Sequence, residues 1–388
     1  MSVAREPIGV IGTGYVGLVT AAGFAELGSE VWCVDIDANK IERLRRGEVP
    51  IYEPGLEELL QRNAARLHFS TDLADALEHA RLLFVAVGTP PTHSGDADLS
   101  AVHAVVNAIP AAKDRALVMK STVPCGTGAS LLRVFGEQGK DDLAYVSCPE
   151  FLKEGSAIKD FLDPDRVVVG DTGGWAGDAV VDLYAPLDAP LVRTDIASAE
   201  MVKLASNAFL ATKISFINEI ANVCEETGAD VVEVARGMGL DDRIGPKFLQ
   251  AGIGFGGSCF PKDVDALKQL AGNSGYHFQL LTAVIEVNEL QKRRVIGKLQ
   301  KHLGSLAGKR VALLGLAFKP ETDDMREASS LVLSARLHAD GALVSAYDPV
   351  AEEQARALVS GITFADSALA AVQDADAVVL VTEWRELV

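Results

Sequence analysis

A short glycine-rich segment near the N-terminus restricts the fold of this chain more than any other feature. The residues "IGVIGTGYVGLVTAAGFAELGSEVWCVDID" (8–37) read as an apolar strand over 8–11, a turn, a helix over 15–27 and a second strand over 31–34. The turn holds Gly12, Gly14 and Gly17 in the spacing GxGxxG. Because it follows a strand and opens a helix, the segment predicts a dinucleotide-binding β-α-β unit.

The positions of this segment have separate predicted roles. Gly12 permits the tight turn, Gly14 lets the backbone approach a pyrophosphate at the helix N-terminus, and Gly17 allows helix and strand to pack closely. Asp35 ends the second strand about 20 residues on, where a carboxylate accepts hydrogen bonds from the adenosine ribose. Its charge, with that of Asp37, repels a 2′-phosphate, so the expected cofactor is NAD rather than NADP. A purely structural glycine turn is the alternative.

The rest of the chain continues as alternating strands and helices, interrupted by a helical middle. Apolar runs at 82–90, 116–123, 143–151 and 166–170 predict further buried strands of a parallel, doubly wound sheet. Helical patterns follow over about 30 residues from 196 and again over 280–303, and strands return at 308–319, 342–349 and 376–384. We therefore expect an α/β fold with two Rossmann-like domains, at 1–195 and 301–388, joined by a helical domain at 196–300.

Charge and cysteine content exclude several classes of protein. The formal net charge of −18 argues against nucleic acid and anionic membrane surfaces as partners. No leader is recognisable and no apolar run approaches the roughly 20 residues that span a bilayer, so the expected location is the cytoplasm. The five cysteines include no CxxC pair or Cys/His cluster, so neither a disulfide framework nor a metal site is expected.

One cysteine stands apart from the others, in "GGSCFPKD" (256–263). Cys259 lies in a turn just before a predicted helix that Asp263 can cap, and Lys262 is three residues away. Helix N-termini and neighbouring lysines favour the thiolate, which is the nucleophilic form. From the residues alone, a catalytic nucleophile, an inert thiol and a metal ligand all remain open.

Motifs along nearly the whole chain resemble those of the UDP-glucose/GDP-mannose dehydrogenase family. They are "GTGYVG" (12–17), "YEPGL" (52–56), "VGTP" (87–90), "KSTVP" (120–124), "PEFLKEGSAIKDF" (149–161), "PDRVVVG" (164–170), "KLASNAFLATKISFINE" (203–219), "RIGPKFLQAGIGFGGSCFPKD" (243–263) and "GLAFKPETDDMREASS" (315–330). Within the family, "GGSCFPKD" resembles the members that act on UDP-glucose.

The resemblance implies a double oxidation of C6 of UDP-glucose, giving UDP-glucuronate, with two NAD. Cys259 would attack the intermediate aldehyde to form a thiohemiacetal, whose oxidation gives a thioester that water hydrolyses. The alternatives are a dehydrogenase of another nucleotide sugar (GDP-mannose or a UDP-N-acetylhexosamine) and a non-catalytic nucleotide-sugar or NAD sensor. A dehydrogenase of simple hydroxy acids would have no use for the thiol.

The resemblance also implies roles for individual residues. Asp263 and Thr122 would hold the water that helps take the substrate proton. Lys203 and Asn207 would stabilise negative charge on the C6 oxygen, and Glu150 would assist thioester hydrolysis. The implied NAD contacts, besides the three glycines, are Tyr15, Val16, Asp35, Lys40, Thr89, Thr122, Glu150, Lys262 and Arg326. The implied sugar-nucleotide contacts are Glu150, Phe151, Leu152, Lys153, Glu154, Lys203, Asn207, Phe248, Leu249, Gln250, Ala251, Gly252, Gly256 and Lys319.

Arg243 resembles an arginine that reaches the sugar site of a neighbouring subunit, which implies a homodimer. Without the resemblance, Lys203 and Asn207 also fit a solvated helix face, and Glu150 fits a carboxylate at a strand end. Lys319 and Arg326 also fit a surface ion-pair network with the nearby acidic residues. Family members continue past "VTEW" with another helix and strand, so we expect the third domain to lack its last elements.

Overall fold

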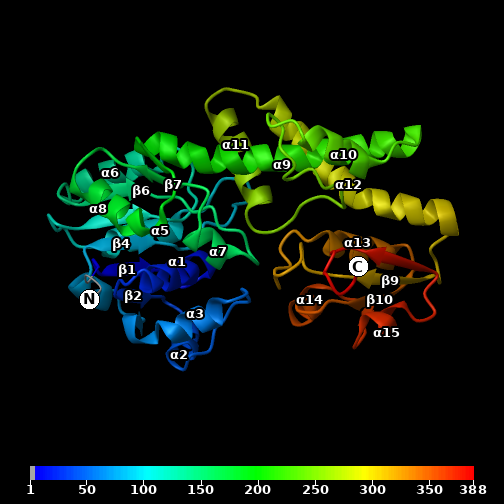
Figure 1. Cartoon of the computed structure of the whole chain (residues 1–388), viewed down its shortest axis with the longest axis horizontal. Coiled ribbons are helices and arrows are strands. Elements are labelled where there is room, and N and C mark those ends of the chain that lie inside the picture. The colour runs from blue at the N-terminus through cyan, green and yellow to red at the C-terminus, as the bar shows by residue number, and fades with distance from the viewer. Residues whose placement is uncertain (1–4) are drawn as a thin grey trace. The chain divides into compact units, whose positions relative to one another are not determined.

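The computed structural model describes residues 5–388 (Figure 1). The chain divides into two compact units between Ala205 and Ser206, and each is described here by itself. The division falls within one continuous helix, α9 (Ile196–Thr227). Among the described residues, no helix combines the length and the apolar character needed to cross a membrane.

The first unit is built on one eight-stranded sheet in the order β3-β2-β1-β4-β5-β6-β7-β8. Its strands are β1 (Ile8–Ile11), β2 (Val31–Val34), β3 (Leu67–Ser70), β4 (Leu82–Val85), β5 (Ala116–Met119), β6 (Ala144–Ser147), β7 (Val167–Gly170) and β8 (Leu191–Thr194). All neighbours pair in parallel except β6 and β7, which meet antiparallel at Ser147 and Gly170. The order 3-2-1-4-5-6 is that of the dinucleotide-binding fold, in which ligands bind where the order reverses, here between β1 and β4.

Helices cover both faces of this sheet, as the alternating sequence pattern predicts. One face packs against α1 (Tyr15–Glu26), α2 (Ala38–Arg45), α3 (Leu56–Arg62), α7 (Ala157–Leu162) and α8 (Trp175–Tyr184). The other packs against α4 (Leu73–His79), α5 (Ser100–Ala108) and α6 (Thr127–Glu137). Two short 3-10 helices, η1 (Ala64–Arg66) and η2 (Ala185–Leu187), complete the unit. The central strands are apolar at every position because both of their faces are buried.

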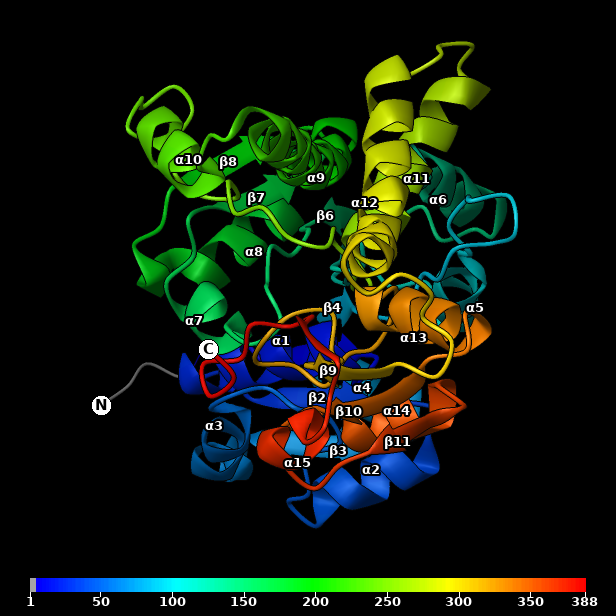
Figure 2. The ribbon, with the colours of Figure 1, turned by 90° about the vertical axis from the view of Figure 1, so that its right-hand side faces the viewer.

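The second unit combines helices with a smaller parallel sheet. Its helical part contains the later turns of α9, then α10 (Val231–Gly239), α11 (Phe260–Asn273) and α12 (Gln279–Leu303), with α11 beside α12 (Figure 2). The sheet has the order β11-β10-β9-β12, from β9 (Arg310–Leu314), β10 (Leu343–Tyr347), β11 (Ile362–Phe364) and β12 (Ala377–Leu380). Helices α13 (Ser329–Ala339), α14 (Glu352–Leu358) and α15 (Ala368–Val372) connect these strands. The order again begins 3-2-1-4, so the prediction of two Rossmann-like sheets with long helices between them is confirmed.

Three strands escape the sequence analysis. The strand β3 contains His68 and the strand β8 is largely exposed, so neither forms the continuous apolar run of a buried strand. The strand β11 has only three residues. All three contribute edges or flanks of their sheets, where burial on both faces is not required.

Candidate active site

The glycine turn after β1 has the geometry that its sequence predicts. Gly12 has a positive φ of 97°, and a Cβ there would lie 2.6 Å from the carbonyl oxygen of Ala86. A Cβ on Gly17 would lie 1.8 Å from the Gly12 carbonyl oxygen, so neither position accepts a side chain. Gly14, in contrast, has no atom within 4 Å of its Cβ direction. The turn therefore leaves open space at the N-terminus of α1, where free N–H groups favour an anion such as a pyrophosphate.

Asp35, at the end of β2, is tied to this turn. Its Oδ2 accepts hydrogen bonds from the Thr13 backbone N (2.7 Å) and hydroxyl (2.8 Å) and from Lys40 Nζ (3.1 Å). Burial raises the pKa of Asp35, but hydrogen bonds from Asp37, Thr13 and Lys40 outweigh it, and the pKa lies below its ordinary value. The carboxylate is therefore ionised and oriented at the edge of the turn, as contact with a ribose requires.

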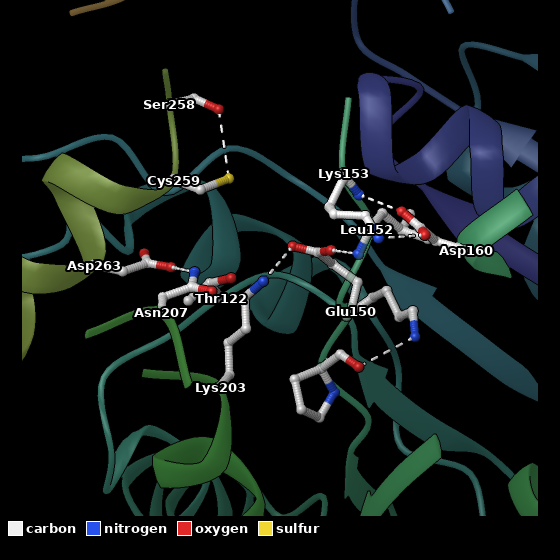
Figure 3. A network of polar contacts seen from close by, with 12 residues as sticks. Thr122, Glu150, Leu152, Lys153, Asp160, Lys203, Asn207, Ser258, Cys259 and Asp263 are labelled. Atoms are coloured by element: carbon white, nitrogen blue, oxygen red, sulfur yellow. Dashed lines mark hydrogen bonds and ion pairs between the residues drawn. The ribbon is translucent and has the colours of Figure 1, made fainter. Parts of the chain in front are cut away.

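A second group of predicted residues lies on the segment after β6. The Glu150 carboxylate accepts from Lys203 Nζ at 2.9 Å, and both side chains are at least 95% buried, with exposures of 5% and 4% (Figure 3). Glu150 also accepts from the backbone N of Leu152. Lys203 thus does not lie on a solvated helix face. Glu150 is not simply a carboxylate at a strand end, because it forms a buried ion pair with Lys203. This pair places a cation and a carboxylate together in the first unit.

Phe151 and Lys153 are fixed next to this pair. The Phe151 ring lies under the guanidinium of Arg166, 3.5 Å from the ring centre, and Lys203 Nζ is 5.4 Å from the same centre. Lys153 pairs through Nζ and its backbone N with Asp160, at 2.7 and 2.9 Å. The sequence predicts no role for Arg166 or Asp160, although both lie within motifs shared with the family.

The loops after β4 and β5 are linked to each other and to α9. The Thr89 hydroxyl donates to the Thr122 carbonyl at 2.9 Å. The Glu200 carboxylate accepts from the backbone N of Gly126 and of Gly128, each at 2.7 Å. Burial raises the pKa of Glu200 above its ordinary value, although these two N–H groups oppose the shift. Glu200 therefore anchors the loop that contains Thr122, a function for which the sequence offers no signal.

In the second unit, Asp263 is the centre of the predicted catalytic residues. It is 1% exposed, and its two oxygens accept from Lys262 Nζ and from Asn207 Nδ2, both at 2.6 Å. Figure 3 shows the contact with Asn207. The prediction that Asp263 caps a helix is wrong, because α11 begins at Phe260 and Cys259 occupies the N-cap position. Pro261 in the first turn, which needs no N–H there, lets the helix start earlier. Asn207 is buried like Lys203, so the solvated-face interpretation does not hold for it either.

Cys259 is half-buried at the N-terminus of the 14-residue helix α11. Its sulfur lies 3.6 Å from the Ser258 hydroxyl oxygen. No cluster of three or more His, Cys, Asp or Glu residues suited to a metal ion occurs within residues 5–388. Cys33, Cys148 and Cys224 are buried, as expected of core cysteines.

The loop before Cys259 is held by two amide side chains for which the sequence predicts no role. Asn288 on α12, only 4% exposed, accepts from Phe255 N at 2.7 Å and donates to Phe255 O at 3.0 Å. Asn218 on α9 accepts from Gly252 N at 2.8 Å. Gly256 packs so tightly that a Cβ would lie 2.3 Å from the Glu327 carbonyl oxygen. Of the other predicted contacts, Leu249 is buried, Phe248 has a positive φ of 65°, and Gln250 and Ala251 are exposed.

Three predicted basic residues have different surroundings in this unit. Arg243 is 89% exposed and pairs with Asp241 at 2.7 Å. Arg326 pairs with Asp324 at 2.7 Å, which is the ion pair that the sequence suggested as an alternative. Lys319 Nζ lies 5.4 Å from the centre of the Phe318 ring.

The second Rossmann-like sheet repeats the turn of the first but uses it differently. Gly315 after β9 has a φ of 82°, and a Cβ there would lie 2.4 Å from Thr382, as Gly12 meets Ala86. Asp348 follows β10 as Asp35 follows β2, but it is 2% exposed. Its oxygens accept from five donors, namely the backbone N of Leu316, Ala317, Val350 and Ala351 and Nε1 of Trp384. The Asp348 oxygens are therefore fully hydrogen-bonded within the protein and cannot accept hydrogen bonds from a ribose, unlike those of Asp35.

Comparison with known proteins agrees with this arrangement. Models of the UDP-glucose/GDP-mannose dehydrogenase family match residues 6–188 as its NAD binding domain, 197–290 as its central domain and 312–388 as its UDP binding domain. The chain is 48% identical to UDP-glucose 6-dehydrogenase TuaD of Bacillus subtilis, over 98% of this chain and 84% of that protein. It is 49% identical to UDP-glucose 6-dehydrogenase of Pseudomonas aeruginosa, over 97% and 87% of the two chains.

A solved structure extends the similarity to three dimensions. A UDP-glucose dehydrogenase from Pyrobaculum islandicum superposes with a TM-score of 0.94 at 40% identity, covering 99% of this chain and 91% of that one. The resemblance seen in the motifs and the prediction of an NAD-binding first domain are both confirmed. The chain belongs to the UDP-glucose/GDP-mannose dehydrogenase family.

Proposed function

We propose that this chain oxidises C6 of UDP-glucose to the carboxylate of UDP-glucuronate, with NAD as the acceptor. The observation that carries the proposal is the thiol of Cys259 at the N-cap of α11, one turn before the buried Asp263. A thiol has no use in a simple alcohol oxidation, but it can hold an aldehyde for a second oxidation. The relatives at 48 and 49% identity, which are named UDP-glucose 6-dehydrogenases, support the same substrate.

The residues at the glycine turn fit NAD. Gly14 leaves the space that a pyrophosphate needs at the N-terminus of α1, and Asp35 is an ionised acceptor for the ribose hydroxyls. When bound, NAD accepts a hydride in each of the two oxidations. The carboxylate of Asp35 disfavours the 2′-phosphate of NADP. Most of the second sheet lies in residues 312–388, which match the UDP binding domain of the family, so we assign the UDP moiety to it.

In the first oxidation, the protein stabilises charge and takes a proton. Lys203 and Asn207 are four residues apart on α9 and so share one face of that helix. Their ammonium and amide donors stabilise negative charge on the C6 oxygen as it loses its proton. A water held by Asp263 and Thr122 receives that proton.

In the second oxidation, Cys259 makes the covalent bond. Its thiolate, favoured at a helix N-terminus, attacks C6 of the aldehyde to give a thiohemiacetal, which a second hydride transfer converts into a thioester. Glu150 then removes a proton from a water that displaces the thiolate and gives the carboxylate. In total, UDP-glucose, two NAD and one water give UDP-glucuronate, two NADH and three protons.

The same proposal includes a homodimer. Phe209, Phe216 and Val223 recur every seven residues on α9 and are 66, 49 and 57% exposed, which forms an apolar stripe in the second unit. Such a stripe is typical of a helix that packs against a partner. The exposed Arg243 extends from the same unit and would reach the sugar site of the partner subunit. We also propose the division into domains 1–195, 196–300 and 301–388.

The test is a panel of nucleotide sugars in which NADH is counted against sugar consumed. We expect two NADH per UDP-glucose and no turnover of GDP-mannose or UDP-N-acetylhexosamines. Turnover of one of those sugars in preference to UDP-glucose would replace the proposed substrate, and binding without any NADH release would indicate a sensor. Cys259→Ala should form no acid while still binding NAD, since the change removes one sulfur from a turn.

A further inference from the structure

A buried glutamate connects the cofactor turn to the segment that carries Glu150. Glu53, in the loop before α3, is 6% exposed. Its Oε2 accepts from the Tyr15 hydroxyl and from Gly155 N at 2.6 Å, and its Oε1 accepts from Ala157 N at 2.7 Å. These donors come from two parts of the first unit that are about 140 residues apart in the sequence, and one carboxylate joins them.

The chemistry of this contact requires a carboxylate. All three partners are donors, and an ionised carboxylate is an acceptor at both oxygens. Burial, together with the hydrogen bond to Glu53, raises the pKa of Tyr15 well above its ordinary value, so the phenol keeps its proton and remains a donor. An amide at position 53 would present N–H to at least one of these donors, and the contact with that donor would be lost.

The two sides of this contact belong to different parts of the proposed site. Tyr15 is the first residue of α1 and follows Gly14, where the pyrophosphate is expected. Gly155, with a φ of 82°, and Ala157 close the segment that begins at Glu150. The other end of that segment is held by Lys203, and its middle by Asp160. Glu53 is therefore a polar attachment of this segment to the cofactor helix, in addition to the direct packing of Phe24 on α1 against Phe161 on α7.

We propose that Glu53 is a positioning residue that couples the binding of cofactor to the binding of UDP-glucose. It helps to fix residues 151–156 relative to the N-terminus of α1. A displacement of Tyr15 on cofactor binding is therefore passed to the sugar-contacting segment through the Glu53 carboxylate. Coupling between two ligands is reciprocal, so each ligand must strengthen the other by the same factor. The inference rests on the proposed function, because it assumes that the segment contacts the nucleotide sugar.

The experiment measures the coupling with a pair of ligands that cannot react. NADH and UDP-glucose form such a pair, because NADH cannot accept a hydride. The dissociation constant of NADH, followed by its fluorescence, is measured without and with saturating UDP-glucose, and the ratio of the two is the coupling factor. We expect a factor of about five or more in the unchanged protein.

Two variants and a control isolate the contact. Tyr15→Phe removes only the hydroxyl, so it should bring the coupling factor close to one and leave the UDP-glucose affinity without NADH within about threefold. Glu53→Gln should abolish the coupling and also weaken UDP-glucose about tenfold or more, since Gly155 or Ala157 loses its acceptor. Glu58→Gln, an exposed glutamate five residues further on, should leave both quantities unchanged.

A coupling factor of one in the unchanged protein, or an unchanged factor in Tyr15→Phe, would overturn the inference. If Glu53→Gln does not fold, Tyr15→Phe decides alone. A separate turnover assay keeps the two proposals apart. Normal oxidation of UDP-glucose with a coupling factor of one refutes this inference alone, whereas failure to oxidise UDP-glucose refutes the proposed function and this inference with it.

Discussion

Replacing Lys203 by methionine tests the buried ion pair in the first unit. The Lys203 ammonium lies 2.9 Å from the Glu150 carboxylate, with side-chain exposures of 4% and 5%. Methionine keeps the apolar stem beside Phe151 but removes the charge, which leaves an ionised carboxylate buried without its cation. Breaking a buried pair in this way costs about 3–5 kcal/mol. For a unit of this size, that corresponds to a fall of about 6–20 °C in the midpoint of thermal unfolding.

A double-mutant cycle with Glu150→Gln shows whether Lys203 and Glu150 stabilise the protein as a pair. Glu150→Gln keeps an oxygen for the Leu152 N–H but turns an amide N–H toward the buried Lys203 ammonium, so we expect a comparable cost of about 3–5 kcal/mol. The double variant should be more stable than the sum of the single effects by about 1–3 kcal/mol, because no buried charge is then left alone. Thermal unfolding of the four proteins at one pH measures this coupling. Strictly additive effects, or a loss below about 1 kcal/mol in Lys203→Met, would refute the importance of the pair.

Four further predictions concern the cofactor, the dependence of stability on pH, and the subunit contact. Asp35→Asn should weaken the binding of NAD about tenfold to a hundredfold and reduce the preference for NAD over NADP, because a charge-assisted hydrogen bond to the ribose is lost. An unchanged affinity for NAD would show that Asp35 does not contact the ribose. Because folding lowers the pKa of Asp35 from 3.8, its ionised carboxylate stabilises the protein above pH 3.8, and this stabilisation is lost as the pH falls below that value. The free energy of unfolding of Asp35→Asn should therefore fall less on acidification than that of the unchanged protein. The same pH dependence in both proteins would contradict this prediction. Phe216→Glu should convert the dimer to monomers in sedimentation, and a persistent dimer would place the interface elsewhere. Arg243→Ala should raise the KM for UDP-glucose far more than the KM for NAD. Mixing equal amounts of Arg243→Ala and Cys259→Ala should restore about a quarter of full activity, because half of the dimers are then mixed and each mixed dimer has one complete site. If no activity returns after subunit exchange has been shown, Arg243 does not contribute to the partner's site.

The parts of the structure that the sequence predicts are those whose causes are local. The strand, glycine turn and helix that end at Asp35 lie within 30 residues, and each step of that unit has its own residue signal. The limits of β1 and β2 agree with the predicted strands for this reason. The thiol at the start of a helix is also a local signal, although Pro261 moves the true start of α11 ahead of Asp263.

Contacts between distant parts of the chain leave no such signal. Glu53 accepts from donors 38, 102 and 104 residues away, and nothing in "YEPGL" indicates where they come from. Asp348 follows a strand just as Asp35 does, and the two look alike in sequence. The difference is visible only in the structure, where two backbone N–H groups of the turn after β9 donate to Asp348, so that its carboxylate is bound within the protein.

The most direct test of the covalent double oxidation is the mass of the protein during turnover of UDP-glucose in the Glu150→Gln variant. This variant should form the thioester and hydrolyse it slowly, so a glucuronyl adduct should accumulate on the peptide that contains Cys259, with two NADH released per adduct. An adduct-free Glu150→Gln protein that forms UDP-glucuronate at the normal rate would contradict the role of Glu150 in hydrolysis, and UDP-glucuronate formed at the normal rate by Cys259→Ala would contradict the covalent role of Cys259.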